Sequence, residues 1–288
     1  EAQKFLERFQ QPEKDIEHSP EPSNSVTLQS FCDEYSIHVS QTKSKDYVRS
    51  IKLSFKMLIE FTGDISLSSL EHRMLDKFFT LTFARTQRGA SLYYRTLKAS
   101  LSTAVLWNYL DENPLKKIKL AKVSKSFPMF ININELKSIL GKTNESYLRE
   151  LYVVAFYTGM RLGELVNMQW NWIDFSKNLI KVKLSDSFIT KSRKERIIPM
   201  NSFLKKLLLL RKSLVSKENN DGYIFFRTQD SNLSEFFVSK KFKTAVNTAK
   251  LDDKIHFHTL RHSFASMLVQ KGVSLYVVKE LLGRESLT

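Results

Sequence analysis

Cysteine is almost absent from this sequence. Cys32 is the one cysteine among 288 residues, so the chain can form neither an internal disulfide nor a cage of thiolates around a metal. Phe31 and Tyr35 stand near it at helical spacing, which predicts that Cys32 packs in a hydrophobic core. We therefore expect a cytoplasmic protein, held under reducing conditions.

Long apolar runs are also missing. The longest aliphatic stretch, residues 207–210, has basic residues on either side, whereas a membrane-spanning helix needs about 20 apolar residues. No secretory signal opens the chain, and its first residue is Glu1 rather than Met. We expect no membrane partner, and we expect the sequence to be part of a longer protein.

Acidic residues are too few to balance the basic ones. The sequence has 45 Lys and Arg against 30 Asp and Glu, a formal net charge of +15. Residues 26–127 and residues 128–288 both carry the basic excess, while residues 1–25 are acidic. Positive charge spread over two folded regions predicts a polyanion partner, nucleic acid. A merely soluble basic protein is the alternative.

A cluster of carboxylates is missing as well. Two-metal nuclease chemistry needs several acidic ligands around one site, and Glu164 with the distant Asp174 does not make one. We expect no metal and no cofactor. A metal-dependent nuclease is therefore the least favoured explanation of the basic composition.

Apolar residues recur at helical spacing through the first half of the chain. Four amphipathic helices are predicted, over residues 27–35, 44–61, 69–84 and 90–110. Thr27 is a candidate N-cap of the first helix, and Gly63 ends the second. Four such helices make a small bundle.

The second half of the chain mixes helices with short strands. Helices are predicted over residues 132–140, 146–157, 202–215, 234–249, 259–270 and 274–282, and strands over 173–174, 179–184 and 196–199. The predicted fold class is mainly α with a small antiparallel β-sheet. The expected organisation is a linker (1–25), a helical domain (26–112), a basic interdomain linker (113–127) and a second domain (128–288).

Lysine is concentrated between the two predicted domains. Residues 114–127 contain five Lys and no acidic residue. Such a run is either a solvated linker or a segment that lies on phosphates. The candidate DNA-binding residues are Lys116, Lys117, Lys119 and Lys122 in this run, with Arg193, Lys240, Lys241 and Lys243 further along the chain.

Arg161 follows a helix-ending glycine in the segment TGMRLGEL, residues 158–165. The guanidinium group is a planar fork of donors that suits phosphate oxygens. Glu164 stands three residues on, on the same helical face, where it can hold the Arg or a neighbouring group. An ordinary surface pair of Arg and Glu is the alternative.

Three further segments carry basic residues in suggestive places. Lys191 lies in a predicted hairpin turn, where it can reach a minor groove or donate a proton to a leaving oxygen; an exposed charged turn is the alternative. His258 and Arg261 stand three residues apart on a predicted helix, so they can meet one phosphate, while His262 is expected to point elsewhere. Gly283 is predicted to end the last helix, with Arg284 emerging from it.

The sequence resembles the tyrosine recombinase (phage integrase) family, of the mobile-element integrase type. The resemblance rests on four features in this order: the TGMRLGEL segment, the hairpin lysine, the HTLR segment (258–261) and the LLG segment (281–283). The resemblance covers residues 26–288 and is sharper in the second domain. It implies a core-DNA-binding domain followed by a catalytic domain. Residues 1–25 would join an arm-binding region, and the protein would act in the bacterial cytoplasm or nucleoid.

By the same resemblance, Arg161, Lys191, His258 and Arg261 are catalytic and Glu164 is the supporting acid. The two arginines would clamp the non-bridging oxygens of a phosphate. His258 would assist a tyrosine hydroxyl, and Lys191 would protonate the departing 5′ oxygen. The intermediate would be a 3′-phosphotyrosyl link to duplex DNA, formed without a metal by a tetramer on paired sites.

Two features depart from the family pattern. Arg284 stands where the family has His or Trp, which makes Arg284 a fifth candidate catalytic residue. The family's nucleophilic Tyr follows a few residues later, but the chain ends at Thr288. Tyr157 and Tyr276 are expected to be packing residues, so we expect the nucleophile to lie outside this chain, which would then be inactive in cleavage. The alternative function is a non-catalytic DNA-binding module, or decoy integrase.

Overall fold

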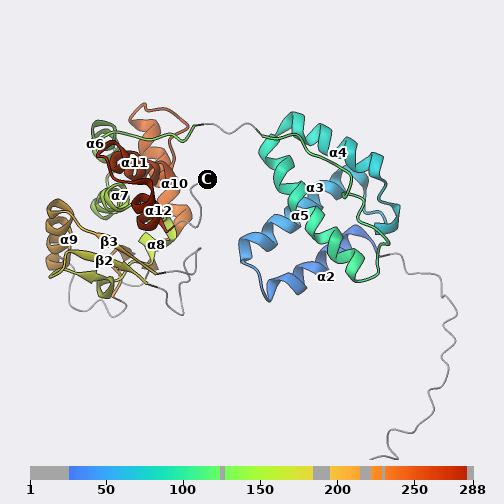
Figure 1. The fold of residues 1–288 in the computed structure, drawn as a ribbon, viewed down its shortest axis with the longest axis horizontal. Helices are drawn as coiled ribbons and strands as arrows, with labels where there is room; N and C mark the ends of the chain where they lie inside the picture. Colours follow the sequence, from blue (N-terminus) through green and yellow to red (C-terminus); the bar gives the residue numbers. More distant parts are fainter. Residues whose placement is uncertain (1–25, 124–126, 184–194, 215–221, 229–230, 284–288) are drawn as a thin grey trace, which may run out of the picture. The chain divides into compact units, whose positions relative to one another are not determined.

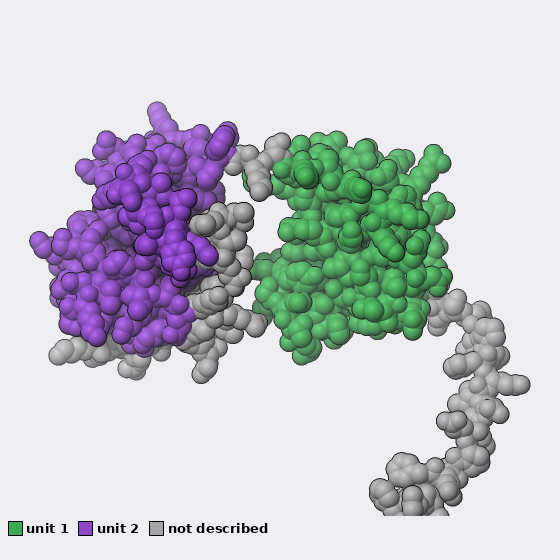
Figure 2. Space-filling view, in the orientation of Figure 1, with its two compact units in different colours: residues 1–125 green, residues 126–288 purple. Residues whose placement is uncertain are grey.

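The computed structural model describes residues 26–123, 127–183, 195–214, 222–228 and 231–283. The chain divides into two compact units, Glu1–Lys125 and Ser126–Thr288, coloured separately in Figure 2. Each unit has a hydrophobic core of its own. Among the described residues, no helix combines the length and the apolar character needed to cross a membrane.

The first unit is a bundle of four helices, as predicted. The helices are α2 (Leu28–Ser40), α3 (Lys45–Thr62), α4 (His72–Arg85) and α5 (Gln87–Leu106), with a short 3-10 turn, η2 (Leu67–Ser69), before α4 (Figure 1). Thr27, Ser44 and Thr86 cap α2, α3 and α5, each through a side-chain oxygen that accepts a backbone N–H. These caps satisfy donors that a helix start would otherwise leave without partners.

Aromatic rings fill much of the core of the first unit. The ring of Phe31 stacks on Tyr35 and meets Phe55 and Trp107 edge-on. Cys32 is buried in this core, as predicted, and burial raises the pKa of its thiol. The buried polar residues of the described part of this unit are Ser and Thr, and Ser54 pairs with Thr96 at 2.6 Å between their hydroxyl oxygens.

The start of the lysine-rich segment packs on the first unit. Leu115 and Ile118 are buried in its core. The hydroxyl of Tyr94 donates to the carbonyl of Ile118 at 2.6 Å, and the side chain of Asn113 donates to the carbonyl of Lys98 at 2.9 Å. Apolar residues thus anchor the segment, while its lysines at 116, 117, 119 and 122 are exposed.

The second unit is mainly helical, which agrees with the predicted fold class. Its helices are α6 (Ile133–Gly141), α7 (Ser146–Thr158), α8 (Leu162–Val166), α9 (Ser202–Leu214), α10 (Glu235–Thr248), α11 (Phe257–Gln270) and α12 (Leu275–Leu282), with the 3-10 turn η3 (Trp170–Trp172). Helix α7 is buried on nearly every side, as expected of a helix that is apolar all round. It packs on α8, α9 and α11.

The predicted antiparallel sheet is present in the second unit. Strands β1 (Ile173–Asp174), β2 (Leu179–Val182) and β3 (Arg196–Pro199) pair in that order, with Ile180 opposite Ile198. The inward-facing Ile180, Val182 and Ile198 are fully buried. Along β3 the side chains alternate, so Arg196 shares the inward face with Ile198.

A second hairpin was not predicted. Strands β4 (Phe226–Thr228) and β5 (Ser231–Asn232) pair in antiparallel fashion. They have three and two residues, and β5 contains no β-branched or aromatic residue that would indicate a strand.

Candidate active site

Gly159 forms the junction at which the site is built. Helix α7 ends at Thr158, and Gly159 follows it in the left-handed conformation with φ +62°. A Cβ at this position would lie 2.5 Å from Cδ1 of Phe264 and 2.9 Å from Cδ2 of Leu282. Backbone conformation and close packing therefore both require glycine here, because α7, α11 and α12 meet at this point.

Arg161 is held by Glu164, the residue predicted to lie on its face. Arg161 is the N-cap residue of α8, and its backbone N–H donates to Oε2 of Glu164 at 2.8 Å. Its guanidinium donates to Oε1 of Glu164 at 3.1 Å and to the carbonyl of Gly283 at 3.1 Å. The side chain remains 22% exposed. Part of a five-donor guanidinium is thus oriented by the protein and part is accessible.

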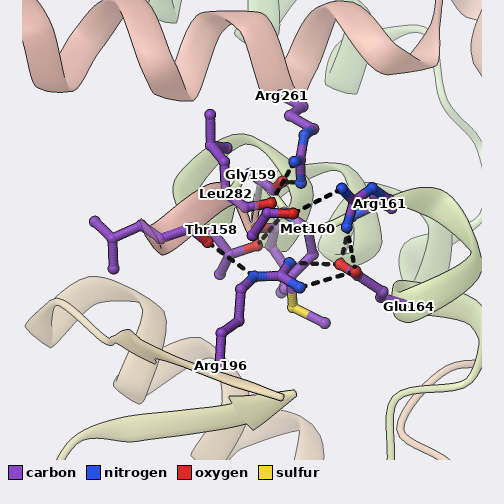
Figure 3. A network of polar contacts seen from close by, with 11 residues as sticks. Thr158, Gly159, Met160, Arg161, Glu164, Arg196, Arg261 and Leu282 are labelled. Carbon is purple, nitrogen blue, oxygen red and sulfur yellow. Dashed lines mark hydrogen bonds and ion pairs between the residues drawn. The ribbon is translucent and has the colours of Figure 1, made fainter. Parts of the chain in front are cut away.

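Arg196 is a member of the site that the sequence analysis did not select. Its guanidinium donates to both oxygens of Glu164, at 2.9 and 2.6 Å, and its Nε donates to the carbonyl of Leu281 at 2.8 Å (Figure 3). The side chain is only 7% exposed. The alternation of side chains along the predicted strand could have identified Arg196. If Ile198 faces inward, so does residue 196, and an inward-facing Arg needs a carboxylate partner.

Glu164 is the negative centre of the cluster and is 1% exposed. Burial acts to raise the pKa of its carboxyl, but the hydrogen bonds and charges of Arg196 and Arg161 more than offset this and lower it. Glu164 is therefore ionised at neutral pH. Its single charge is shared by two guanidinium groups, those of Arg196 and Arg161.

Arg261 completes that set from α11. It is 3% exposed, and its two terminal nitrogens donate to carbonyls at two helix ends, to Gly159 at 2.7 Å and to Leu282 (Figure 3). Carbonyls at helix C-termini lack partners within the helix and carry partial negative charge. The ends of α7 and α12 thus hold the guanidinium of Arg261 in a fixed position.

His258 lies on α11 together with Arg261, and its side chain is exposed. The expectation that His262 points elsewhere is wrong, because the rings of His258 and His262 meet edge-on with centroids 5.0 Å apart. Residues four apart on a helix share a face as closely as residues three apart. The two histidines therefore form one surface feature of α11.

The remaining candidates fall into two groups. Lys191, Arg193 and Arg284 lie outside the described residues. Lys240 is exposed, whereas Lys241 pairs with Glu145 at 2.6 Å and Lys243 donates to the carbonyls of Asp253 and Ile255. The ammonium groups of Lys241 and Lys243 therefore have partners within the protein.

The two tyrosines considered as nucleophiles differ in their surroundings. Tyr157 packs against the rings of Phe156 and Phe203, as expected. Tyr276 was expected in the core, but it is 67% exposed. The buried residues of α12 are Val278 and Leu282, which stand four apart on the side of the helix opposite its exposed face. Within the described residues, no group of three or more His, Cys, Asp or Glu could hold a metal ion.

Two family models match the chain. The model described as "Phage integrase family" matches residues 130–288, and the model described as "Phage integrase SAM-like domain" matches residues 27–120. The first spans the whole arginine cluster, and the second spans the four-helix bundle.

Curated relatives are similar along most of the chain. A "Tyrosine recombinase" of Thermosipho africanus is 27% identical over 271 residues, which cover 91% of this chain and 92% of the relative. A "Tyrosine recombinase XerC" of Pediococcus pentosaceus is 30% identical over 250 residues, covering 82% of this chain and 81% of the relative.

Solved structures share the fold at lower identity. A lambda integrase tetramer bound to a Holliday junction is 23% identical with a TM-score of 0.77, covering 100% of this chain and 86% of that one. The Tn1549 transposon integrase, in complex with a circular intermediate DNA, is 16% identical with a TM-score of 0.74, covering 89% of this chain and 92% of that one.

Proposed function

Because the chain belongs to the phage integrase family of tyrosine recombinases, we propose that it is a site-specific DNA recombinase, an integrase that cuts and rejoins duplex DNA through a 3′-phosphotyrosyl intermediate. The observation that carries the proposal is the pairing of Arg161 and Arg196 with one buried Glu164, with Arg261 held nearby by the carbonyls of Gly159 and Leu282. The accessible part of the Arg161 guanidinium offers charged donors that suit a phosphodiester.

The chemistry follows from where negative charge develops. A tyrosine oxygen attacks the phosphorus, the bond from phosphorus to the 5′ oxygen breaks, and the phenolic proton is lost as the 5′ oxygen gains one. Arg161 stabilises the non-bridging oxygens through its accessible N–H groups, and Arg261 does so through a guanidinium that two carbonyls hold in place. His258 accepts or donates the nucleophile's proton, and Lys191 protonates the 5′ oxygen. Arg284 is a further donor to the phosphate.

The attacking tyrosine is not among residues 1–288 in this proposal. Tyr157 is held in an aromatic cluster. Tyr276 precedes Gly283 by seven residues on the same helix, which corresponds to about 10 Å along its axis. Side chains on a helix tilt toward its N-terminus, so the Tyr276 hydroxyl points away from Gly283, where Arg161 bonds.

Duplex DNA is the proposed partner, and the protein would act in the bacterial cytoplasm or nucleoid. Residues 26–112 would form the core-DNA-binding domain, 113–127 a basic connection, and 128–288 the catalytic domain, with residues 1–25 joining an arm-binding region. Phosphate contacts from the exposed Lys116, Lys117, Lys119 and Lys122 would make the affinity fall steeply with salt. Assembly to a tetramer on paired sites would bring the strands to be exchanged together.

A covalent-adduct assay tests the proposal. The cognate site is first selected from a random pool of duplexes, and a nick is placed so that the released strand diffuses away and the adduct accumulates. The protein expressed from its complete gene is expected to form an adduct through a tyrosine, and Arg161→Ala is expected to bind the same duplex without forming one. Normal adduct formation by Arg161→Ala would contradict the proposed role of the cluster.

The same assay separates the alternatives. Residues 1–288 alone are expected to bind the duplex without forming an adduct, and an adduct on Tyr157 or Tyr276 would disprove the proposed location of the nucleophile. Binding without any adduct by the product of the complete gene would identify a DNA-binding module or decoy integrase. Cleavage that a chelator abolishes would identify a metal-dependent nuclease.

A further inference from the structure

Arg196 connects three parts of the second unit that are far apart in sequence. It begins strand β3, and its guanidinium bonds to Glu164 on α8 and to the carbonyl of Leu281 at the end of α12. These partners stand 32 and 85 positions away. A side chain with such bonds fixes how the strand, α8 and the end of α12 meet.

The bonds of Arg196 to Glu164 are shorter than those of Arg161. Oε1 accepts from Arg196 at 2.9 Å and from the Arg161 side chain at 3.1 Å; Oε2 accepts from Arg196 at 2.6 Å and from the Arg161 backbone at 2.8 Å. The bidentate fork on the carboxylate thus belongs to Arg196. Arg161 keeps one side-chain bond to Glu164, enough to orient its guanidinium.

Without Arg196 the buried carboxylate would have to be compensated differently. A charge that is 1% exposed needs a partner, and the nearest remaining guanidinium is that of Arg161. Arg161 would turn to form the bidentate pair itself, and the donors now accessible to a ligand would be drawn into the protein. Arg196 therefore keeps Arg161 oriented without sequestering it.

The end of α12 depends on the same residue. Leu281 bonds to Arg196, and the next two carbonyls, of Leu282 and Gly283, accept from Arg261 and Arg161. A Cβ on Gly283, where φ is +59°, would lie 3.1 Å from Cδ of Arg196. The bond from Arg196 to Leu281 holds the end of α12, and with it the two carbonyls that accept from the other arginines.

We propose that Arg196 is a positioning residue for DNA strand cleavage, which acts by neutralising Glu164 and fixing the end of α12 so that Arg161 stays available to the phosphate. This inference rests on the proposed recombinase function. It predicts a loss in the cleavage step that is separate from DNA binding and from the stability of the fold.

Arg211 provides a matched control within the same unit. Its side chain is 9% exposed, its Nε donates to the carbonyl of Ile224 at 2.6 Å, and its NH1 donates to Glu150 at 2.7 Å. It thus repeats the carbonyl-and-carboxylate arrangement of Arg196 without touching Glu164 or α12. Arg196→Lys and Arg211→Lys both keep the charge and remove a guanidinium that bonds to a carbonyl and a carboxylate, although only Arg196 bonds to both oxygens of its carboxylate.

The experiment uses the protein expressed from its complete gene and measures adduct formation at saturating protein, the Kd for the same duplex, and Tm. Arg196→Lys is expected to slow adduct formation about 10- to 100-fold with the Kd unchanged within about twofold. Arg211→Lys is expected to lower Tm to a similar extent and to leave the adduct rate within about threefold of wild type. Arg196→Met, which keeps the length of the side chain, serves if the Lys variant does not fold.

A double-mutant cycle tests the route through Glu164. If Arg196 acts through that carboxylate, Arg196→Lys combined with Glu164→Gln should slow cleavage no more than the slower single variant. Losses that multiply would overturn the route through Glu164, and an Arg196 variant as fast as the Arg211 control would overturn the inference, while wild-type cleavage upholds the proposed function. No adduct from the wild-type protein would overturn the proposed function itself.

Discussion

The two units bury different kinds of polar residue. In the described part of the first unit the buried polar side chains are Ser36, Ser54, Thr82, Thr96 and Ser100, whereas in the second unit they include Glu164, Arg211 and Arg261. Hydroxyl groups can bond back to helix carbonyls, as Ser54 and Ser100 do, so they are buried at little cost. Buried charges need partners of opposite charge or carbonyls in fixed places.

The buried polar groups of the first unit only stabilise its fold. Those of the second unit also fix the positions of charged side chains at the candidate active site. Replacing a buried ion pair by apolar residues of similar volume is often neutral or stabilising. Glu164 and its arginines are therefore weakly explained by stability alone. They are better explained as groups held ready for a negatively charged ligand, since fixed donors need no rearrangement when the ligand's charge increases.

Removing Arg161 is expected to have the largest effect. Arg161→Ala should lower the rate of strand cleavage by about 1000-fold, equivalent to about 4 kcal/mol in the barrier, because an accessible donor set is lost from the site. The Kd for duplex DNA should change by less than about threefold, because the other basic residues remain. Parallel rate and gel-shift measurements check this. A large loss of binding would show that Arg161 contributes to DNA affinity like the exposed lysines, and would contradict its proposed role in cleavage alone.

Removing the charge of Glu164 is expected to destabilise only the second unit. Glu164→Gln leaves Arg196 and Arg161 buried or half-buried without their counter-ion, which should cost about 3 kcal/mol. Ser54→Ala in the first unit should cost about 1 kcal/mol. Hydrogen exchange followed by mass spectrometry on the intact chain reads each unit separately, and equal losses in the two units would refute the contrast between them.

Acid should affect the second unit first. The pKa of Glu164 is lowered in the folded protein, against burial, by Arg196 and Arg161, and that of Glu145 is lowered chiefly by its bond to Lys241. A lowered pKa contributes stability that is present above the unfolded value, near 4.5, and is lost as pH falls through the folded value. Protection of amides in the second unit, relative to their intrinsic exchange rate at each pH, should therefore fall below about pH 4.5, and Glu164→Gln should weaken that dependence.

Single lysines are expected to have the smallest effects and to distinguish the units again. Lys119→Gln removes an exposed ammonium of the first unit and should reduce the slope of log K against log salt by about 1. Lys243→Gln removes one that bonds to the carbonyls of Asp253 and Ile255, and should leave the slope unchanged. A titration of DNA binding against salt measures both, and equal slopes for the two variants would count against the proposed phosphate contacts.

Local patterns predicted the helices well because their signals are local. Thr27 caps α2, Gly63 follows the end of α3, and Gly159 ends α7, as expected. The face of α12 was harder, because an apolar run from Leu275 to Val278 does not say which residues point inward. The structure buries Val278 and leaves Tyr276 exposed, since one side of a short helix suffices to cover Phe264.

The site was predicted in part. The pairing of Arg161 with Glu164 needs only the spacing of three residues, whereas the pairing of Arg196 with Glu164 spans 32 positions and depends on how β3 packs against α8. In the same way, the lysines of the segment 114–123 predicted an exposed, charged connection. The sequence did not predict that Leu115 and Ile118 anchor the first part of this segment in the core of the first unit.

The central claim is that Arg161 stabilises negative charge on the phosphate that is cut. It is tested most directly by replacing that phosphate with a methylphosphonate, in which a methyl group takes the place of one charged oxygen. Arg161→Ala is expected to form the adduct at least about 10-fold faster on the neutral methylphosphonate than on the phosphate, because the charge that needed the arginine is gone. Equally slow cleavage of both duplexes by Arg161→Ala would contradict the account.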